Sequence, residues 1–283
     1  MRENLLLTEE MKMGKKAVKA YKNQGFLGSG DARTIRILSE YLEPAARFRK
    51  LNIKDTIVFY GSARVTDGET ARKHHDLWKK RYQEKPSKEH EKELRLAKVK
   101  LHMSRYYDDA RELARLLTNW SISLKNSHHR FIVCSGGGPG IMEAINRGAI
   151  DVPNGKSIGL NISIPMEQDS NPYITPDLNF EFHYFFMRKF WFVYLAKALV
   201  IFPGGFGTMD ELWEVLTLLQ TGKIQKKMAV VLYGEDYWKK VINFQYMVDN
   251  LVIEQEDLSL FHFANSPQDA FEYLRDKLTE AFL

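Results

Sequence analysis

The sequence is short of cysteine and long apolar runs, and each shortage excludes a class of protein. Cys134 is the only cysteine among 283 residues, so no internal disulfide and no cysteine-rich zinc site can form. The apolar runs are much shorter than the ~20 residues that cross a bilayer. The first residues carry Glu9 and Glu10 directly after a short leucine run and so lack the apolar core of a secretory signal. We therefore expect a cytoplasmic protein with no membrane partner.

Glycine and proline are not enriched, with 18 and 9 residues respectively. Hydrophobic residues make up 44% of the chain and charged residues 27%. This composition excludes collagen-like, low-complexity and largely disordered proteins. The length suits one large α/β domain or at most two small ones.

The net charge of +5 comes from one segment. Residues 71–105 hold 12 Lys or Arg and five acids, a balance of +7, and the rest of the chain is −2. The acids and bases are interleaved, which is typical of a solvent-exposed helix face. Pro86 should divide the segment into two helices. We expect an exposed helix pair and no nucleic-acid partner, with a functional basic patch as the alternative.

Strands and helices alternate along most of the chain. Residues 8–22 and 31–50 are predicted helices that precede the first strand. Near-continuous apolar runs predict strands, which begin at Thr56 and Phe131 and span 156–163, 180–185, 198–202 and 228–233. The predicted helices between and after them cover 141–150, 188–197, 211–220, 236–250 and a tail from Pro267, capped by Ser266.

This order is typical of a parallel sheet covered on both faces. We predict an α/β fold, a Rossmann-like doubly wound parallel sheet in three α/β/α layers. An N-terminal helical extension over 1–54 precedes a nucleotide-binding catalytic domain over 55–283, which carries a charged helical insert at about 66–105.

Small residues follow three of the predicted strands, at the edge where open parallel sheets bind ligands. A phosphate is held best by backbone N–H groups at a helix N-terminus, and glycine leaves that approach open. A tight turn without ligand is the alternative, but repeated glycine clusters favour a phosphate or nucleotide site. The candidate binding residues are Gly61, Ser62, Gly136, Gly137, Gly138, Gly204, Gly205, Gly207 and Thr208.

Two familiar nucleotide-binding motifs do not fit. The sequence has no G-x-x-x-x-G-K-[ST], which excludes a Walker-type ATPase. The run GGGPGI breaks the G-x-G-x-x-G spacing at its last position, which disfavours a dinucleotide dehydrogenase.

The run PGGFGTMDE at 203–211 resembles the PGGxGTxxE signature of the Lonely Guy family, long labelled "putative lysine decarboxylase". Three further pieces match in order: YGSAR at 60–64, SGGGPGIMEA at 135–144 and HYFFMRKF at 183–190. The stretch GLNISIPMEQDSNPY at 159–173 looks like the longer bacterial branch, which shades into purine nucleotide nucleosidases. The resemblance covers roughly residues 55–235.

The resemblance implies hydrolysis of the N-glycosidic bond of a nucleoside 5′-monophosphate, either AMP or a cytokinin riboside monophosphate. The products are a free base and ribose 5-phosphate. Family members use the arginine of an Arg-Lys pair and the last glutamate of the signature, which correspond to Arg188 and Glu211. Lys189 and Glu143 are further candidate substrate contacts. The resemblance also implies a homodimer or higher homo-oligomer, and it calls for no metal or cofactor.

The chemistry of the residues agrees with these roles, although plainer interpretations exist. A carboxylate such as Glu211 can stabilise an oxocarbenium-like transition state and orient water. Glu211 could instead cap the backbone N–H of Thr208 in a capping box. Arg188 could lie on a solvated helix face, and Glu143 could favour only the helix dipole. The proton donor to the base is not identified.

Other chemically capable residues have plainer interpretations that we favour. Cys134 follows three apolar residues and is expected to be a buried small side chain. Asn171 and Tyr173 lie in a plausible active-site loop, but we favour turn formation as the explanation for them. The histidine pairs 74–75 and 128–129 are adjacent and share no helix face, so a metal site is disfavoured. The aromatic residues of 185–192 are expected to form core and dimer contacts rather than a base-stacking platform.

Two other functions compete with the hydrolase. Lysine decarboxylation needs pyridoxal phosphate on a lysine with a pyridinium partner, and the sequence supplies no such set. A non-catalytic nucleotide carrier or sensor on the same fold stays open, because fold does not determine function.

Overall fold

The computed structural model describes residues 17–124, 129–164 and 169–283, which divide into two compact units. The first unit, Met1–Glu43, contains the 3-10 helix η2 (Ala20–Lys22), the short helix α1 (Gln24–Leu27) and the start of α2 (Arg33–Lys50). The helix predicted over 31–50 is thereby confirmed. The helix predicted over 8–22 lies mostly outside the described residues, and within 17–22 only η2 is helical.

The second unit, Pro44–Leu283, is built on a seven-stranded sheet in which every pairing is parallel. Its order is β4-β3-β2-β1-β5-β6-β7. The strands are β1 (Thr56–Tyr60), β2 (Ile132–Ser135), β3 (Ser157–Ile162), β4 (Asn179–Phe182), β5 (Ala196–Ile201), β6 (Ala229–Tyr233) and β7 (His262–Ala264). The chain starts at the central β1, runs outward to β4, and returns to the other side through β5. This reversal confirms the doubly wound fold and places a ligand crevice between the ends of β1 and β5.

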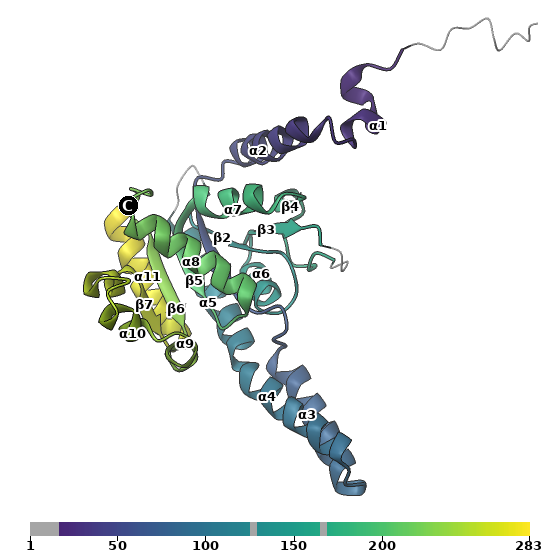
Figure 1. The fold of residues 1–283 in the computed structure, drawn as a ribbon, viewed down its shortest axis with the longest axis vertical. Coiled ribbons are helices and arrows are strands. Elements are labelled where there is room, and N and C mark those ends of the chain that lie inside the picture. The colour runs from purple at the N-terminus through teal and green to yellow at the C-terminus, as the bar shows by residue number, and fades with distance from the viewer. Residues whose placement is uncertain (1–16, 125–128, 165–168) are drawn as a thin grey trace, which may run out of the picture. The chain divides into compact units, whose positions relative to one another are not determined.

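Helices cover both faces of this sheet (Figure 1). The helices α5 (Arg105–Ser123), α6 (Ile141–Ile150) and α11 (Pro267–Phe282) share one hydrophobic core with alternate strand residues such as Ile57 and Phe59. Because side chains alternate along a strand, Val58 and Tyr60 point to the opposite face. The helices α7 (Phe185–Tyr194) and α8 (Phe206–Gln220) cover that face. The three predicted layers are therefore confirmed.

The charged segment forms the two helices that Pro86 predicts, α3 (Gly68–Glu84) and α4 (Lys88–Met103), which pack against each other (Figure 1). The hydroxyl of Ser87 accepts a hydrogen bond from the backbone N–H of His90 and so caps α4. Both helices are mostly exposed, as their mixed charges predict. Helix α5 then leads back over the sheet.

Four predicted elements differ from the structure. Phe185 begins α7 rather than ending a strand, and α7 ends at Tyr194, before Lys197 of β5. Helix α8 starts at Phe206, so it includes the last residues of the glycine loop. The helix predicted over 236–250 is two helices, α9 (Glu235–Val241) and α10 (Phe244–Asp249), and the side chain of Asn243 caps the second. The 3-10 helices η3 (Pro176–Leu178) and η4 (Gln255–Leu260) and the strand β7 were not predicted.

One buried ion pair ties the first two central strands together at the edge of the sheet opposite the glycine loops. Asp55 precedes β1, and its carboxylate accepts hydrogen bonds from Nε and Nη2 of Arg130 at 3.0 and 2.7 Å. It also accepts from the backbone N–H of Phe131 at 2.6 Å. The two side chains are 0% and 9% exposed, so each charge depends on the other.

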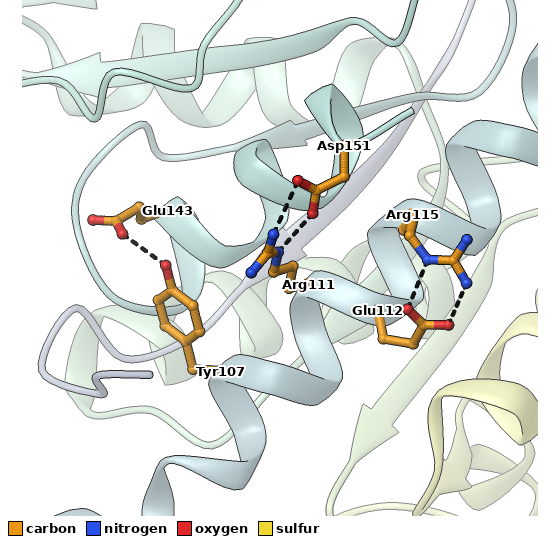
Figure 2. A network of polar contacts seen from close by, with 6 residues as sticks. All are labelled: Tyr107, Arg111, Glu112, Arg115, Glu143 and Asp151. Carbon is orange, nitrogen blue, oxygen red and sulfur yellow. Dashed lines mark hydrogen bonds and ion pairs between the residues drawn. The ribbon is translucent and has the colours of Figure 1, made fainter. Parts of the chain in front are cut away.

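We predict that Asp55→Ala lowers the free energy of unfolding by about 3–5 kcal/mol, because it leaves the Arg130 charge buried without its partner. Urea denaturation measures the change. The matched control is Asp151→Ala, since Asp151 pairs with Arg111 across α5 and α6 in a site that is about a third exposed (Figure 2). That variant should lose about 1 kcal/mol or less. Equal losses in the two variants would contradict the prediction.

Candidate active site

The ends of β1 and β5 and the start of α6 are joined by the backbone of Ser62. Its N–H donates to the carbonyl of Pro203, and its carbonyl accepts from the N–H of Ile141, both at 3.1 Å. One residue earlier, Phe202 donates to the carbonyl of Tyr60 at 2.8 Å. The Ser62 hydroxyl accepts from the N–H of Arg64 at 3.1 Å and so stabilises the turn that follows. These bonds bring the three predicted glycine loops to one place.

Gly61 is required here by close packing. A Cβ at this position would lie 2.6–2.9 Å from the side chain of Ile141, at the start of α6. Gly140 has a φ of +70°, and a Cβ on it would lie 2.7–2.8 Å from Ala63. Both glycines therefore allow the loop after β1 to contact the N-terminus of α6 directly.

The buried side chain of Asn171 holds the loop after β2 through hydrogen bonds. Its amide donates to the carbonyls of Gly137 and Gly138 at 2.9 and 3.1 Å, and to Oδ1 of Asn146 at 2.9 Å. The side-chain Oδ1 of Asn171 also accepts from the N–H of Tyr173, which is the expected turn contact. Turn formation is thus only part of its role. The sequence placed Asn171 near the site but could not show that it supports the glycine loop.

A cavity of about 690 Å³ opens at the carboxyl ends of β1 and β5. Nine of the candidate site residues line it: Gly61, Ser62, Gly136, Arg188, Gly204, Gly205, Gly207, Thr208 and Glu211. Further lining residues include Tyr60, Phe185, Phe206 and Tyr237. The structure therefore gathers residues that are more than 140 positions apart in the sequence around one hollow.

The N-terminus of α8 forms one wall of this cavity. Gly205 is the N-cap residue, so the backbone N–H groups of Phe206, Gly207 and Thr208 belong to the first turn, whose donors have no partner within a helix. The first turn of α8 also places Thr208 inside the helix, so the capping box between Thr208 and Glu211 does not form. That interpretation of Glu211 is wrong.

The three glycines of the loop at 203–208 serve different purposes. A Cβ on Gly204 would collide with the side chain of Thr208, and the carbonyl of Gly204 accepts from the hydroxyl of Tyr237 at 2.7 Å. A Cβ on Gly205 or Gly207 would meet nothing within 4 Å. Packing within the described chain therefore explains Gly204 but leaves the other two glycines without a packing reason.

Glu211 is 7% exposed and faces the cavity from the first turns of α8. Burial raises the pKa of its carboxyl from the ordinary 4.5 to about 7, although Arg188 and Lys189 act in the opposite direction. No hydrogen bond or ion pair reaches this carboxylate from residues 17–124, 129–164 or 169–283. A carboxylate held in this way titrates near neutral pH, which suits acid–base work.

Arg188 lies in the cavity wall and not on a solvated helix face, so the plainer interpretation of it is wrong. Its Nε donates to the carbonyl of Leu160 at 2.7 Å, and its guanidinium lies 4.9 Å from the ring centre of Phe192. A Cβ on Gly136 would lie 2.5 Å from Nη2 of Arg188, so the glycine makes room for the guanidinium. Burial lowers the pKa of Arg188, and the nearby Glu211 carboxyl opposes that shift.

Four candidates do not line the cavity. Gly137 and Gly138 turn their carbonyls toward Asn171, and Gly137 has a φ of +74° that favours glycine. Lys189 forms ion pairs with Asp210 at 2.7 Å and Glu214 at 3.2 Å. Glu143 accepts a hydrogen bond from the hydroxyl of Tyr107 at 2.7 Å (Figure 2). Their roles toward a ligand stay predictions.

One of the remaining sequence candidates, Phe185, also lines the cavity. Cys134 is buried in β2, and burial raises the pKa of its thiol. Trp191 and Phe192 are buried, whereas Phe185, Phe186 and Phe190 are exposed along α7. Within the described ranges, no group of three or more His, Cys, Asp or Glu side chains could hold a metal ion. No helix in the same ranges is long and apolar enough to cross a membrane.

A comparison with protein families matches residues 142–274 to the model described as "Possible lysine decarboxylase". The matched range contains Arg188, Lys189 and the whole PGGFGTMDE run, and it confirms the resemblance drawn from the motifs. No curated protein matches the chain. A solved structure, the molybdenum cofactor binding protein from the phototrophic bacterium Rippkaea orientalis, is similar at 16% identity and a TM-score of 0.48. That similarity covers 79% of this chain and 96% of the other.

We predict that Glu211→Gln makes the protein more stable than the wild type at pH 8 but not at pH 4.5. The folded-state pKa of about 7 lies above the ordinary 4.5, so the folded protein keeps its proton over a range where the unfolded chain loses it. Wild-type stability therefore falls as pH rises from about 4.5 to about 7. The difference between the two pKa values corresponds to about 3 kcal/mol of unfolding free energy. Glutamine does not titrate, so the stability of the variant does not change with pH in this way. Urea denaturation at both pH values checks this, and a constant difference between the variants would contradict it.

Proposed function

We propose that the chain hydrolyses nucleoside 5′-monophosphates, because residues 142–274 match the family described as "Possible lysine decarboxylase" and the motifs resemble the Lonely Guy family. The bond broken joins the base to C1′ of the ribose, and water adds its hydroxyl to C1′ while the base gains a proton. The substrate is AMP or a cytokinin riboside monophosphate. The observation that carries the proposal is the buried carboxyl of Glu211, which accepts no hydrogen bond from the described residues and lies beside Arg188 in a cavity at a helix N-terminus.

The first turn of α8 is the proposed phosphate site. The N–H groups of Phe206, Gly207 and Thr208 have no partner within the helix, and the positive end of the helix dipole favours an anion. Gly205 and Gly207 leave open space that a side chain would occupy, and a phosphate needs that close approach. The guanidinium of Arg188 adds a positive charge in the same cavity.

Glu211 lies one helical turn after Thr208, so a phosphate at the loop brings the ribose over its carboxylate. As the base leaves, positive charge develops at C1′ and O4′. An ionised Glu211 whose side chain is buried stabilises that charge more strongly than a solvated carboxylate. The same group can orient the attacking water. Arg188 is held by Leu160 and stabilises the phosphate or the departing base.

We predict that Glu211→Gln lowers the release of adenine from AMP by roughly 10²–10⁴-fold, because the amide carries no charge and accepts no proton. Chromatography of AMP incubated with purified protein measures the base. In the wild type, the rate should rise with pH through about 7, as Glu211 ionises. The control is Glu112→Gln, which changes a half-exposed carboxylate paired with Arg115 on α5 (Figure 2).

Intact AMP with the wild type would move the test to isopentenyladenosine monophosphate and the other purine monophosphates. If all of these bound and none was cleaved, the carrier or sensor interpretation would replace the enzyme. A Glu211→Gln variant with full activity would remove Glu211 from the mechanism.

We predict that Gly207→Ala weakens AMP binding by roughly 10-fold or more without loss of thermal stability. The added methyl group meets no protein atom within 4 Å, and alanine is the better residue inside a helix. It does, however, enter the space through which a phosphate would reach the helix amides. Calorimetric titration with AMP and thermal unfolding give the two quantities. Unchanged affinity would show that the phosphate binds elsewhere.

A further inference from the structure

The hydroxyl of Tyr60 is a buried donor that has no acceptor among the residues that the structure describes. Tyr60 is the last residue of β1, is 6% exposed, and lines the same cavity as Arg188 and Glu211. Its ring packs against Phe192 with 5.1 Å between the ring centres, which holds the side chain on the α7 and α8 face of the sheet. Among the residues that the structure describes, its hydroxyl makes no hydrogen bond. Such a hydroxyl has lost its hydrogen bonds to water on burial and has formed none with the described residues in their place.

The carboxylate of Glu211 is an acceptor that lacks a donor, since it receives no hydrogen bond from the described part of the chain. The two groups lie within electrostatic reach of each other. Burial raises the pKa of Tyr60 well above 10, and the Glu211 carboxylate is the largest of the neighbouring charges that raise it further. An ionised carboxylate accepts hydrogen bonds strongly, so these two groups are suited to each other once Glu211 carries its charge.

The other charged groups around this pair come from every element packed against it. Arg188 and Lys189 approach from α7, and both favour the ionised form of Glu211. Asp210 and Glu214 lie on α8 beside it and oppose ionisation. Cys134 of β2 lies near Tyr60. Lys189 is already paired with Asp210 and Glu214, and Arg188 donates through Nε to Leu160.

We propose that Tyr60 is a positioning residue: its hydroxyl donates a hydrogen bond to the ionised carboxylate of Glu211 when a ribose 5-phosphate group, alone or as part of a nucleotide, fills the cavity. The bond keeps Glu211 ionised and directs its carboxylate at C1′ of the ribose. The inference rests on the proposed function, and it adds a residue outside the Arg-Lys pair and the PGGFGTMDE run.

The test is Tyr60→Phe, which removes one oxygen atom that makes no hydrogen bond in the described part of the chain. We expect kcat for AMP to fall roughly 10- to 100-fold at pH 7, the effect of one hydrogen bond to a charged group. The KM should stay within about twofold, because the bond acts through Glu211 and not on the substrate. The acidic limb of the kcat–pH profile should move to higher pH by about half a unit or more, since the lost donor favoured the ionised carboxylate.

The matched control is Tyr233→Phe. Tyr233 ends β6, has a buried hydroxyl near Asp109, and belongs to the core on the opposite face of the sheet. This variant should leave the kcat–pH profile unchanged, whatever its thermal stability. A Tyr60→Phe enzyme with wild-type kcat and an unmoved acidic limb would overturn the proposal. Loss of thermal stability with an unmoved acidic limb would also overturn it, since the hydroxyl would then be purely structural.

A second measurement separates this inference from the proposed function. The Glu211 carboxyl can be titrated by ¹³C NMR with ribose 5-phosphate bound, in the wild type and in Tyr60→Phe. A higher Glu211 pKa in the variant supports the hydrogen bond, and equal values refute it, whether or not the protein turns over AMP. If the wild type releases no base from any nucleotide, the proposed function fails while the titration still decides the role of Tyr60.

Discussion

The backbone of Ser62 is the contact on which the site depends, because it joins segments that come from three parts of the chain. Its N–H and carbonyl hydrogen-bond to Pro203 after β5 and to Ile141 at the start of α6. The contact with Ile141 needs glycine on both sides, since a Cβ on Gly61 would collide with the Ile141 side chain and a Cβ on Gly140 would collide with the backbone of Ser62 and Ala63. Parallel strands give these bonds a common edge. The cavity then follows from the point where the chain reverses its direction across the sheet.

A second feature is electrostatic and works against stability. Glu211 and Arg188 are buried, and burial raises the pKa of Glu211 and lowers the pKa of Arg188, so it favours the neutral form of each. Neither side chain is compensated as fully as Asp55, which has the Arg130 guanidinium and a backbone N–H at hydrogen-bond distance. The contrast separates two uses of buried charge. The pair at the opposite edge of the sheet is satisfied and holds strands together, while the cavity keeps a carboxyl ready for a ligand.

Local patterns predicted the elements well where a single segment determines its own structure. The apolar runs became strands of the central sheet, Pro86 separated α3 from α4, and Ser266 capped α11. The predictions were wrong where contacts with another segment of the chain determine the local structure. β7 is three residues long and exists because it pairs with β6. The glycine loop looked like an irregular turn up to Thr208, but Gly205 caps a helix that already includes Phe206. That shift by one turn removed the capping box and left Glu211 without a backbone partner.

The sequence by itself determined the α/β alternation, the glycines at three strand ends, and the confinement of the positive charge to one helix pair. These follow from periodicity and composition, which act over a few residues. Only the tertiary structure decided that Tyr60, Arg188 and Glu211 share one cavity, and that Asn171 supports the glycine loop from behind. Strand order and burial set those distances. A carboxyl pKa near 7, or a hydroxyl that has no acceptor among the described residues, is a property of the surroundings, which no single segment contains.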